Sequence, residues 1–285
     1  MYHDIYKIDN AINLDDSLCF HTPDAYPNFQ HDLEKFKSHI IELVNTKQSV
    51  TFYKFGDGDY RFLLREHVGS AKPGNRALSK SYDEIDHVVF TRGAQKCDYY
   101  TCEIYPKNRS MFRSVINKTP DYPAEFTYGL IANKWFFEQF KGRIGLLGAS
   151  EKLYLIEELM AHKEYQDYLG LESFSDYIHF PQKYAADDIE LVEEFVGQQL
   201  KESSADIFLL GIGHAKSGLL HNLKKYKSAV YLDVGTGIDM IAGCINSYRP
   251  FAGGWKNFRL SNYDYSQIDY LKYNASNEVL LKNNS

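Results

Sequence analysis

The chain has 285 residues, of which 44% are hydrophobic, so it can bury a substantial core as one large α/β domain or two small ones; we favour one. Its net charge is −6 and its basic residues are scattered, which argues against nucleic acid as the main partner. It has four irregularly spaced cysteines, no apolar run of about 18 residues and no signal-peptide pattern, which favours a cytoplasmic protein with reduced thiols.

Apolar periodicity predicts helices and strands in alternation along the chain. A helix is expected over 32–45 and a strand over 49–55, and a second helix is expected to begin at Tyr60, just beyond an acidic pair. The later predictions are helices over 82–93 and 133–140, a strand over 143–148, a helix over 151–162, a strand over 177–180 and a helix over 187–201.

The clearest unit follows, as a strand over 206–210, a glycine-containing turn over 211–217, a helix over 218–225 and a strand over 229–234. Short connections of this kind imply a parallel pair with a right-handed crossover. The predicted fold class is therefore α/β, with a Rossmann-like, mostly parallel sheet flanked by helices.

We treat residues 1–285 as a single domain with three parts. The core spans about 50–243, and a helical extension over 1–48 precedes it. An aromatic and arginine-rich loop with a polar tail follows over 244–285, and Trp255 with Arg249 or Arg259 forms either a lid over a sugar or part of a packed loop.

Three predicted strand ends carry glycine together with polar residues. They are G-D-G-D from Gly56, G-I-G-H-A-K-S from Gly211 and D-V-G-T-G-I-D from Asp233. Ligands of doubly wound sheets bind at the carboxyl ends of the strands. We therefore expect the three segments to face one crevice.

The first segment places Asp57 and Asp59 one residue apart on a turn made pliable by Gly56 and Gly58. Paired carboxylates of this kind can hold Mg²⁺ or Mn²⁺, and substrate phosphate oxygens can complete the coordination. The alternative is an Asp-Gly turn with solvated carboxylates.

The second segment can present backbone N–H groups of Gly211 and Gly213 to a phosphate, with His214 as a titratable donor and Lys216 as a positive charge. It lacks the spacing of a P-loop or of a complete dinucleotide-binding motif. The alternative is a tight turn that needs glycine for its geometry.

The third segment offers Asp233 and Asp239, either of which can order a substrate hydroxyl or act as a general base. For Asp239, capping of the following helix is an equally good interpretation.

Together these segments resemble the GT-D type of bacterial glycosyltransferase. The family's R-F-G-D-G-E-like motif corresponds to K-F-G-D-G-D, and its later motifs correspond to P-Q-K-Y-A-A-D-D-I from Pro181, L-L-G-I-G-H-A-K-S-G-L-L from Leu209 and Y-L-D-V-G-T-G-I-D from Tyr231. The order of the motifs is kept from about Val50 to Gly243. This chain departs from the family at Asp59, at Tyr184 and at Thr236-Gly237.

The resemblance implies the GT-D fold and transfer of a sugar from a nucleotide sugar, a UDP-sugar such as UDP-glucose, UDP-galactose or UDP-xylose, to a hydroxyl of a glycan acceptor in polysaccharide or glycoprotein glycan synthesis. It implies Mn²⁺ or Mg²⁺ on Asp57 and Asp59, and donor contacts from Lys183 and Lys216. Asp233, Asp239 and His214, in that order, are the candidate proton acceptors.

Two other functions are compatible with parts of this pattern. A non-catalytic glycan-binding protein on the same fold would bind saccharide without consuming a UDP-sugar. A methyltransferase would need an acidic cofactor-binding residue soon after a first glycine loop, and no convincing candidate is present.

Overall fold

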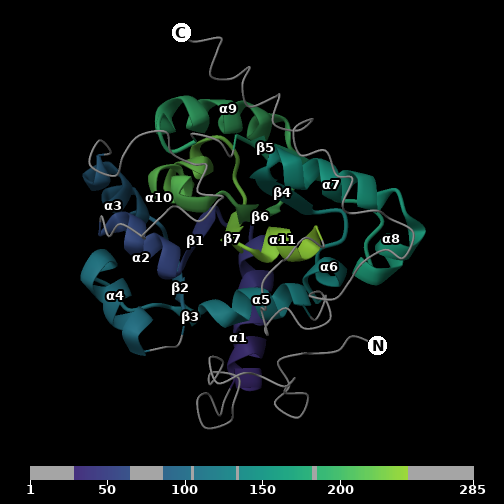
Figure 1. Cartoon of the computed structure of the whole chain (residues 1–285). Coiled ribbons are helices and arrows are strands. Elements are labelled where there is room, and N and C mark those ends of the chain that lie inside the picture. The colour runs from purple at the N-terminus through teal and green to yellow at the C-terminus, as the bar shows by residue number, and fades with distance from the viewer. Residues whose placement is uncertain (1–28, 65–85, 104–105, 133–134, 182–184, 243–285) are drawn as a thin grey trace.

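The computed structural model describes residues 29–64, 86–103, 106–132, 135–181 and 185–242. Its strands form one seven-stranded sheet in the order β3-β2-β1-β7-β6-β4-β5, and every neighbouring pair is parallel (Figure 1). Helices flank this sheet on both faces. The predicted α/β, Rossmann-like fold class is confirmed.

The elements alternate along the chain. The strands are β1 (Val50–Phe55), β2 (Tyr99–Cys102), β3 (Tyr122–Pro123), β4 (Ile144–Ala149), β5 (Asp176–Phe180), β6 (Ile207–Gly211) and β7 (Val230–Asp233). The helices are α1 (Phe29–Asn45), α2 (Asp57–Leu63), α3 (His87–Gln95), α4 (Pro106–Ile116), α5 (Ala124–Ala132), α6 (Trp135–Gln139), α7 (Ser150–Met160), α8 (Lys163–Leu169), α9 (Ile189–Glu202), α10 (Lys216–Leu219) and α11 (Gly237–Ile241), with 3₁₀ helices η4 (Gly213–Ala215) and η5 (Leu220–Lys225) beside α10.

Each face of the sheet carries its own hydrophobic cluster, because successive side chains of a strand point to opposite faces. On β1, Phe52 packs with residues of α1, α5, α6, α7, α8 and α11. Its neighbour Tyr53 packs with residues of α2, α3, α4, α9, α10 and η5. Figure 1 shows these two groups of helices on opposite sides of the sheet. Strands covered on both faces are typical of parallel sheets, and their apolar runs follow from this burial.

Strand β7 is the last strand in the chain, yet it lies at the centre of the sheet. Tyr231 pairs with Thr51 of β1 on one side and with Phe208 of β6 on the other. The strand therefore joins the β1–β3 half to the β4–β6 half. It also brings the carboxyl ends of β1, β7 and β6 together at one edge.

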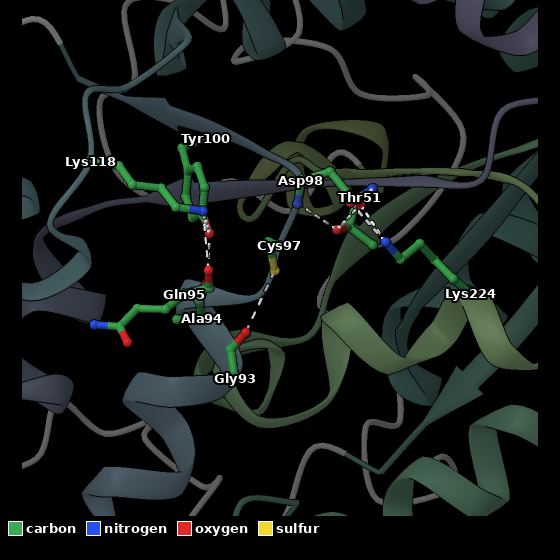
Figure 2. Close-up of polar contacts among 9 residues, drawn as sticks. All are labelled: Thr51, Gly93, Ala94, Gln95, Cys97, Asp98, Tyr100, Lys118 and Lys224. Atoms are coloured by element: carbon green, nitrogen blue, oxygen red, sulfur yellow. Dashed lines mark hydrogen bonds and ion pairs between the residues drawn. The ribbon is translucent and has the colours of Figure 1, made fainter.

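At the opposite edge, Asp98 ties three segments together (Figure 2). Its carboxylate accepts hydrogen bonds from the backbone N–H and the hydroxyl of Thr51, both at 2.8 Å, and from Lys224 Nζ at 2.7 Å. Cys97, next to Asp98, and Cys102, at the other end of β2, are buried as free thiols, and burial raises the pKa of each to about 12. These contacts fasten β1, the start of β2 and η5 to one another.

The structure corrects several predicted boundaries. Helix α2 begins at Asp57, not at Tyr60, because the Asp59 side chain accepts the Gly56 N–H at 2.9 Å and closes the first turn around the acidic pair. Helical structure begins at Gly213 inside the predicted turn over 211–217. Strands β2 and β3 and helices α4, α5 and α8 were not predicted. With two residues, β3 is too short to show any periodicity.

Several sequence interpretations concern residues that lie outside the described part of the chain, among them the arginine-rich loop over 244–285, Lys183 and most of the predicted extension over 1–48. Within the extension, α1 contributes Leu33, Phe36 and Ile40, each 0% exposed, to the core. No helix in the described ranges is long and apolar enough to cross a membrane.

Candidate functional site

The three glycine-containing segments follow neighbouring strands. G-D-G-D follows β1, D-V-G-T-G-I-D continues from β7 and G-I-G-H-A-K-S continues from β6, and these strands are adjacent in the sheet. All strands run in the same direction, so the three segments lie at one edge. In parallel α/β sheets this edge is where ligands bind.

The ammonium group of Lys216 is the centre of this edge. Its Nζ lies 2.7 Å from Asp233 Oδ2 and 3.1 Å from Asp59 Oδ2, contacts the carbonyl oxygen of Lys54, and sits 4.7 Å from the centre of the Tyr53 ring. Lys216 is 6% exposed. Burial disfavours its charge, but Asp233 and Asp59 outweigh burial, so the pKa of Lys216 is raised and the residue is a cation.

Asp233 is held by donors from two strand ends. Its Oδ2 accepts the Lys54 N–H at 3.1 Å as well as the Lys216 contact, and its Oδ1 accepts the Gly235 N–H at 3.0 Å. The last residue pair between β1 and β7 is Phe52 with Leu232, and the hydrogen bond from the Lys54 N–H to Asp233 lies just beyond it. Asp233 thus extends the connection between the two strands. A carboxylate with both oxygens hydrogen-bonded and only 2% exposed is not placed to contact a substrate hydroxyl.

Asp59 is equally engaged. Its Oδ2 accepts the Gly56 N–H, and its Oδ1 accepts the Tyr53 hydroxyl at 3.2 Å. The Tyr53 hydroxyl also shares a 2.7 Å hydrogen bond with Ser217 Oγ. Burial and the nearby Asp59 charge raise the pKa of Tyr53, so Tyr53 is neutral and donates to the carboxylate.

These contacts determine how well the acidic pair fits a divalent cation. Asp59 is 6% exposed and already faces a tyrosine hydroxyl, a backbone N–H and an ammonium group. A cation at Asp59 would stand beside the positive charge of Lys216, so this carboxylate does not fit a metal ligand in the present arrangement. The Asp57 side chain is outside the description, and within the described ranges no group of three or more His, Cys, Asp or Glu side chains is placed to hold a metal.

His214 lies at the rim of the same edge. Its ring stacks on Phe62 of α2, with ring centres 4.7 Å apart and planes 13° from parallel. A side chain at Gly58 would have its Cβ 3.5 Å from His214 Cε1, so the imidazole stands directly beside the G-D-G-D turn. The residue is half-buried. Of the three proton acceptors suggested by the sequence, His214 is the one at the rim and beside this turn.

Asp239 is on the other side of the β7 segment. It is the third residue of α11 and forms an ion pair with Lys152 of α7. No side chain caps α11. The Asp239 interaction therefore connects two helices on the face opposite to Lys216.

The glycines of the edge serve different purposes. A Cβ at Gly211 would stand 2.7 Å from Ile238, and one at Gly237 would stand 2.8 Å from Ile131 and Val234, so close packing requires both glycines. Gly213 adopts a φ of 56°, a conformation that glycine adopts easily. A Cβ at Gly56 or Gly58 would meet no described atom closer than 3.5 Å.

Sequence reasoning missed Tyr53, Lys54 and Ser217. Lys54 did carry a signal, because a lysine in the apolar run V-T-F-Y-K-F is unexpected in a strand covered on both faces. Ser217 carried no signal in the sequence, because its hydrogen bond with Tyr53 joins α10 to β1, two elements far apart in the chain.

Comparisons with protein-family models, with curated proteins and with solved structures find no match to this chain. The order of the motifs and the geometry of the edge are therefore the basis for a functional assignment.

Proposed function

We propose that this protein is a glycosyltransferase that transfers a sugar from a nucleotide sugar, with UDP-sugars as the first candidates, to a hydroxyl of a glycan acceptor. The observation that supports the proposal is the meeting of G-D-G-D, D-V-G-T-G-I-D and G-I-G-H-A-K-S at the carboxyl ends of β1, β7 and β6. These are motifs whose order resembles that of the GT-D type.

In this proposal some residues of the edge hold the structure in place, and others take part in the reaction. Lys216, Asp59 and Asp233 hold the three segments in a fixed relation, and positioning of this kind lowers the barrier of a two-substrate reaction. His214 is our preferred acceptor for the proton of the acceptor hydroxyl, because it lies at the rim beside Gly58 and an imidazole titrates near neutral pH.

Dependence on Mn²⁺ or Mg²⁺ is part of the proposal, with Asp57 as the first ligand. When bound, the ion would neutralise charge on the leaving diphosphate. Asp59 would join it only by giving up its contact with Lys216, and we assign no step of the reaction to the ion.

The direct test measures UDP release from UDP-glucose, UDP-galactose, UDP-xylose and UDP-N-acetylhexosamines, each with Mn²⁺, with Mg²⁺ and with chelator. We expect one donor to be consumed, faster with metal, and His214→Ala to lower kcat by about 10²–10⁴-fold. Lys141→Gln is the control, because Lys141 is exposed before β4 at the opposite edge. No consumption of any donor would overturn the proposal, and saccharide binding without consumption would favour the non-catalytic alternative.

A further inference from the structure

Three oxygen atoms of the candidate site converge on one nitrogen atom. Asp233 Oδ2 and Asp59 Oδ2 lie 2.7 Å and 3.1 Å from Lys216 Nζ, and the carbonyl oxygen of Lys54 contacts the same nitrogen. Carboxylates and backbone carbonyls are the oxygen ligands that hard divalent cations bind in proteins. The composition of this shell is therefore that of a cation site, with the ammonium group of Lys216 as the cation.

The oxygen atoms of this shell are held by groups other than Lys216. Asp59 Oδ2 accepts the Gly56 N–H at 2.9 Å, and Asp233 Oδ2 accepts the Lys54 N–H at 3.1 Å. The Lys54 carbonyl belongs to strand β1. Because none of these anchors is part of the Lys216 side chain, we expect the three oxygen atoms to keep their places when that side chain is shortened.

The charges of the shell are withdrawn from water. Lys216, Asp59 and Asp233 are 6%, 6% and 2% exposed. Two buried carboxylates carry two negative charges, and the ammonium compensates one of them. Without a cation the pair is strongly unfavourable, since like charges in a medium of low dielectric repel each other and lack their hydration. Removal of the ammonium therefore leaves a strong drive to take up another cation.

The ammonium of Lys54 lies at the same edge but is not the cation of this shell. Its Nζ is 3.6 Å from the point where a Cβ at Gly56 would stand and 3.7 Å from the corresponding point at Gly235. The Lys54 side chain leaves β1 on the face opposite to Tyr53. Lys216 Nζ, in contrast, sits 4.7 Å from the centre of the Tyr53 ring and so reaches the oxygen atoms from the face of Tyr53.

We propose that Asp59, Asp233 and the Lys54 carbonyl form a cation site whose built-in occupant is the Lys216 ammonium, and that Mn²⁺ or Mg²⁺ binds there once the ammonium is removed. The site does not depend on the proposed function, because these contacts are the same whether or not the protein transfers sugars. In the wild type the ammonium excludes a divalent ion from Asp59. An ion that serves the proposed reaction must therefore bind without this carboxylate.

The test follows the melting temperature of the full chain by circular dichroism in chelator, in MgCl₂ and in MnCl₂ at constant ionic strength. Lys216→Ala should melt well below the wild type in chelator. Mn²⁺ at about 100 times its Kd should raise the melting temperature of this variant by about 5–10 °C, because the ion binds the folded chain. Calorimetry should find one Mn²⁺ in Lys216→Ala that the wild type does not bind.

Two further variants control for other effects of the ion. Lys216→Ala combined with Asp59→Asn should lose the response to Mn²⁺, because one of the two carboxylates is gone. Lys152→Ala removes a lysine that pairs with Asp239, where the two side chains are 23% and 20% exposed. A partly exposed pair leaves no buried charge behind, so Lys152→Ala should respond to the ions as the wild type does.

Asp59→Asn alone provides a second measurement if Lys216→Ala does not fold in any condition. This variant keeps the pair of Lys216 with Asp233. Because the ammonium occupies the site, Asp59→Asn and the wild type should bind Mn²⁺ equally, and both may bind none at this position. A loss of affinity of about tenfold or more in Asp59→Asn would instead identify Asp59 as a metal ligand of the wild type.

Two results would overturn the inference. One is a folded Lys216→Ala protein whose melting temperature ignores both ions, and the other is the loss of Mn²⁺ affinity in Asp59→Asn. Neither result bears on sugar transfer, which is decided separately by the release of UDP in the donor screen.

Discussion

At the scale of single residues, the most consequential feature is the buried ion cluster of Lys216, Asp59 and Asp233. Its contribution to stability depends on the presence of all three charged side chains. Removing one member of a buried charge cluster leaves the others uncompensated, whereas an exposed ion pair contributes little. The side chains of Lys216, Asp59 and Asp233 are 8%, 8% and 1% exposed.

We therefore expect Lys216→Met to lower the free energy of unfolding by about 3–5 kcal/mol, measured by urea denaturation. Lys152→Met is the matched control, because Lys152 also pairs with a carboxylate, Asp239, but the two side chains are 23% and 20% exposed. The control should lose less than about 1 kcal/mol. Equal losses in the two variants would show that the cluster is not the structural anchor described above.

Residue-scale prediction from sequence was only partly possible here. Glycine and aspartate after an apolar run identified the G-D-G-D segment, because the residue types that favour turns and strand ends can be recognised from the sequence alone. Nothing in the sequence around Asp59 indicated that Lys216 is its partner. Lys216 reaches it from the segment after β6, and only the order of strands brings the two together.

At the scale of elements, helix α9 shows how one glycine sets the distance between neighbouring segments. Gly197 faces the ring of Tyr226, which follows η5, and a Cβ at this position would stand 2.3 Å from the nearest ring atom. Alanine is the better helix former, but here it has no room. The ring can lie against α9 because residue 197 has no side chain.

Gly197→Ala should consequently destabilise the protein by about 1–3 kcal/mol, although the intrinsic helix propensity changes in the opposite direction. Thermal unfolding followed by circular dichroism provides the measurement. Combination with Tyr226→Ala should remove most of the additional cost, since the clashing ring is then absent. A stabilised single variant would contradict the packing described for α9.

Helices α1, α7 and α9 were predicted to within a few residues because each carries enough turns to show its period, whereas the 11-residue helix α4 was not predicted. Helix α9 was expected over 187–201 and spans Ile189–Glu202. Strands β2 and β3 were not expected, because the four residues of β2 and the two residues of β3 form strands through pairing with β1 and with each other. Tertiary contacts alone select these segments.

At the scale of the whole molecule, the position of β7 makes the fold a single unit. The β1–β3 and β4–β6 halves have no direct strand pairing in the sheet, and both pair with β7. Tyr231, at the centre of that strand, stacks on Phe208 with ring centres 5.3 Å apart, and its hydroxyl donates to Lys227 O at 2.8 Å.

Tyr231→Pro should prevent folding of the entire chain, because proline removes a ladder N–H and is excluded from central strands. Circular dichroism and limited proteolysis would detect the loss. Tyr231→Phe keeps the strand and the ring, so it should fold and lose only about 0.5–1.5 kcal/mol per missing hydrogen bond. A folded Tyr231→Pro protein would refute the central role of β7.

The sequence by itself determined the α/β class, the approximate places of several of the longer helices and strands, and the strand ends where glycine and aspartate gather, because periodicity and the residue preferences of turns are local properties of a chain. Only the tertiary structure decided that β7 lies between β1 and β6, that Lys216 joins Asp59 to Asp233, and that Lys54 stands between Gly56 and Gly235. The physical reason is that these contacts depend on strand order, and strand order follows from packing both faces of one sheet at once.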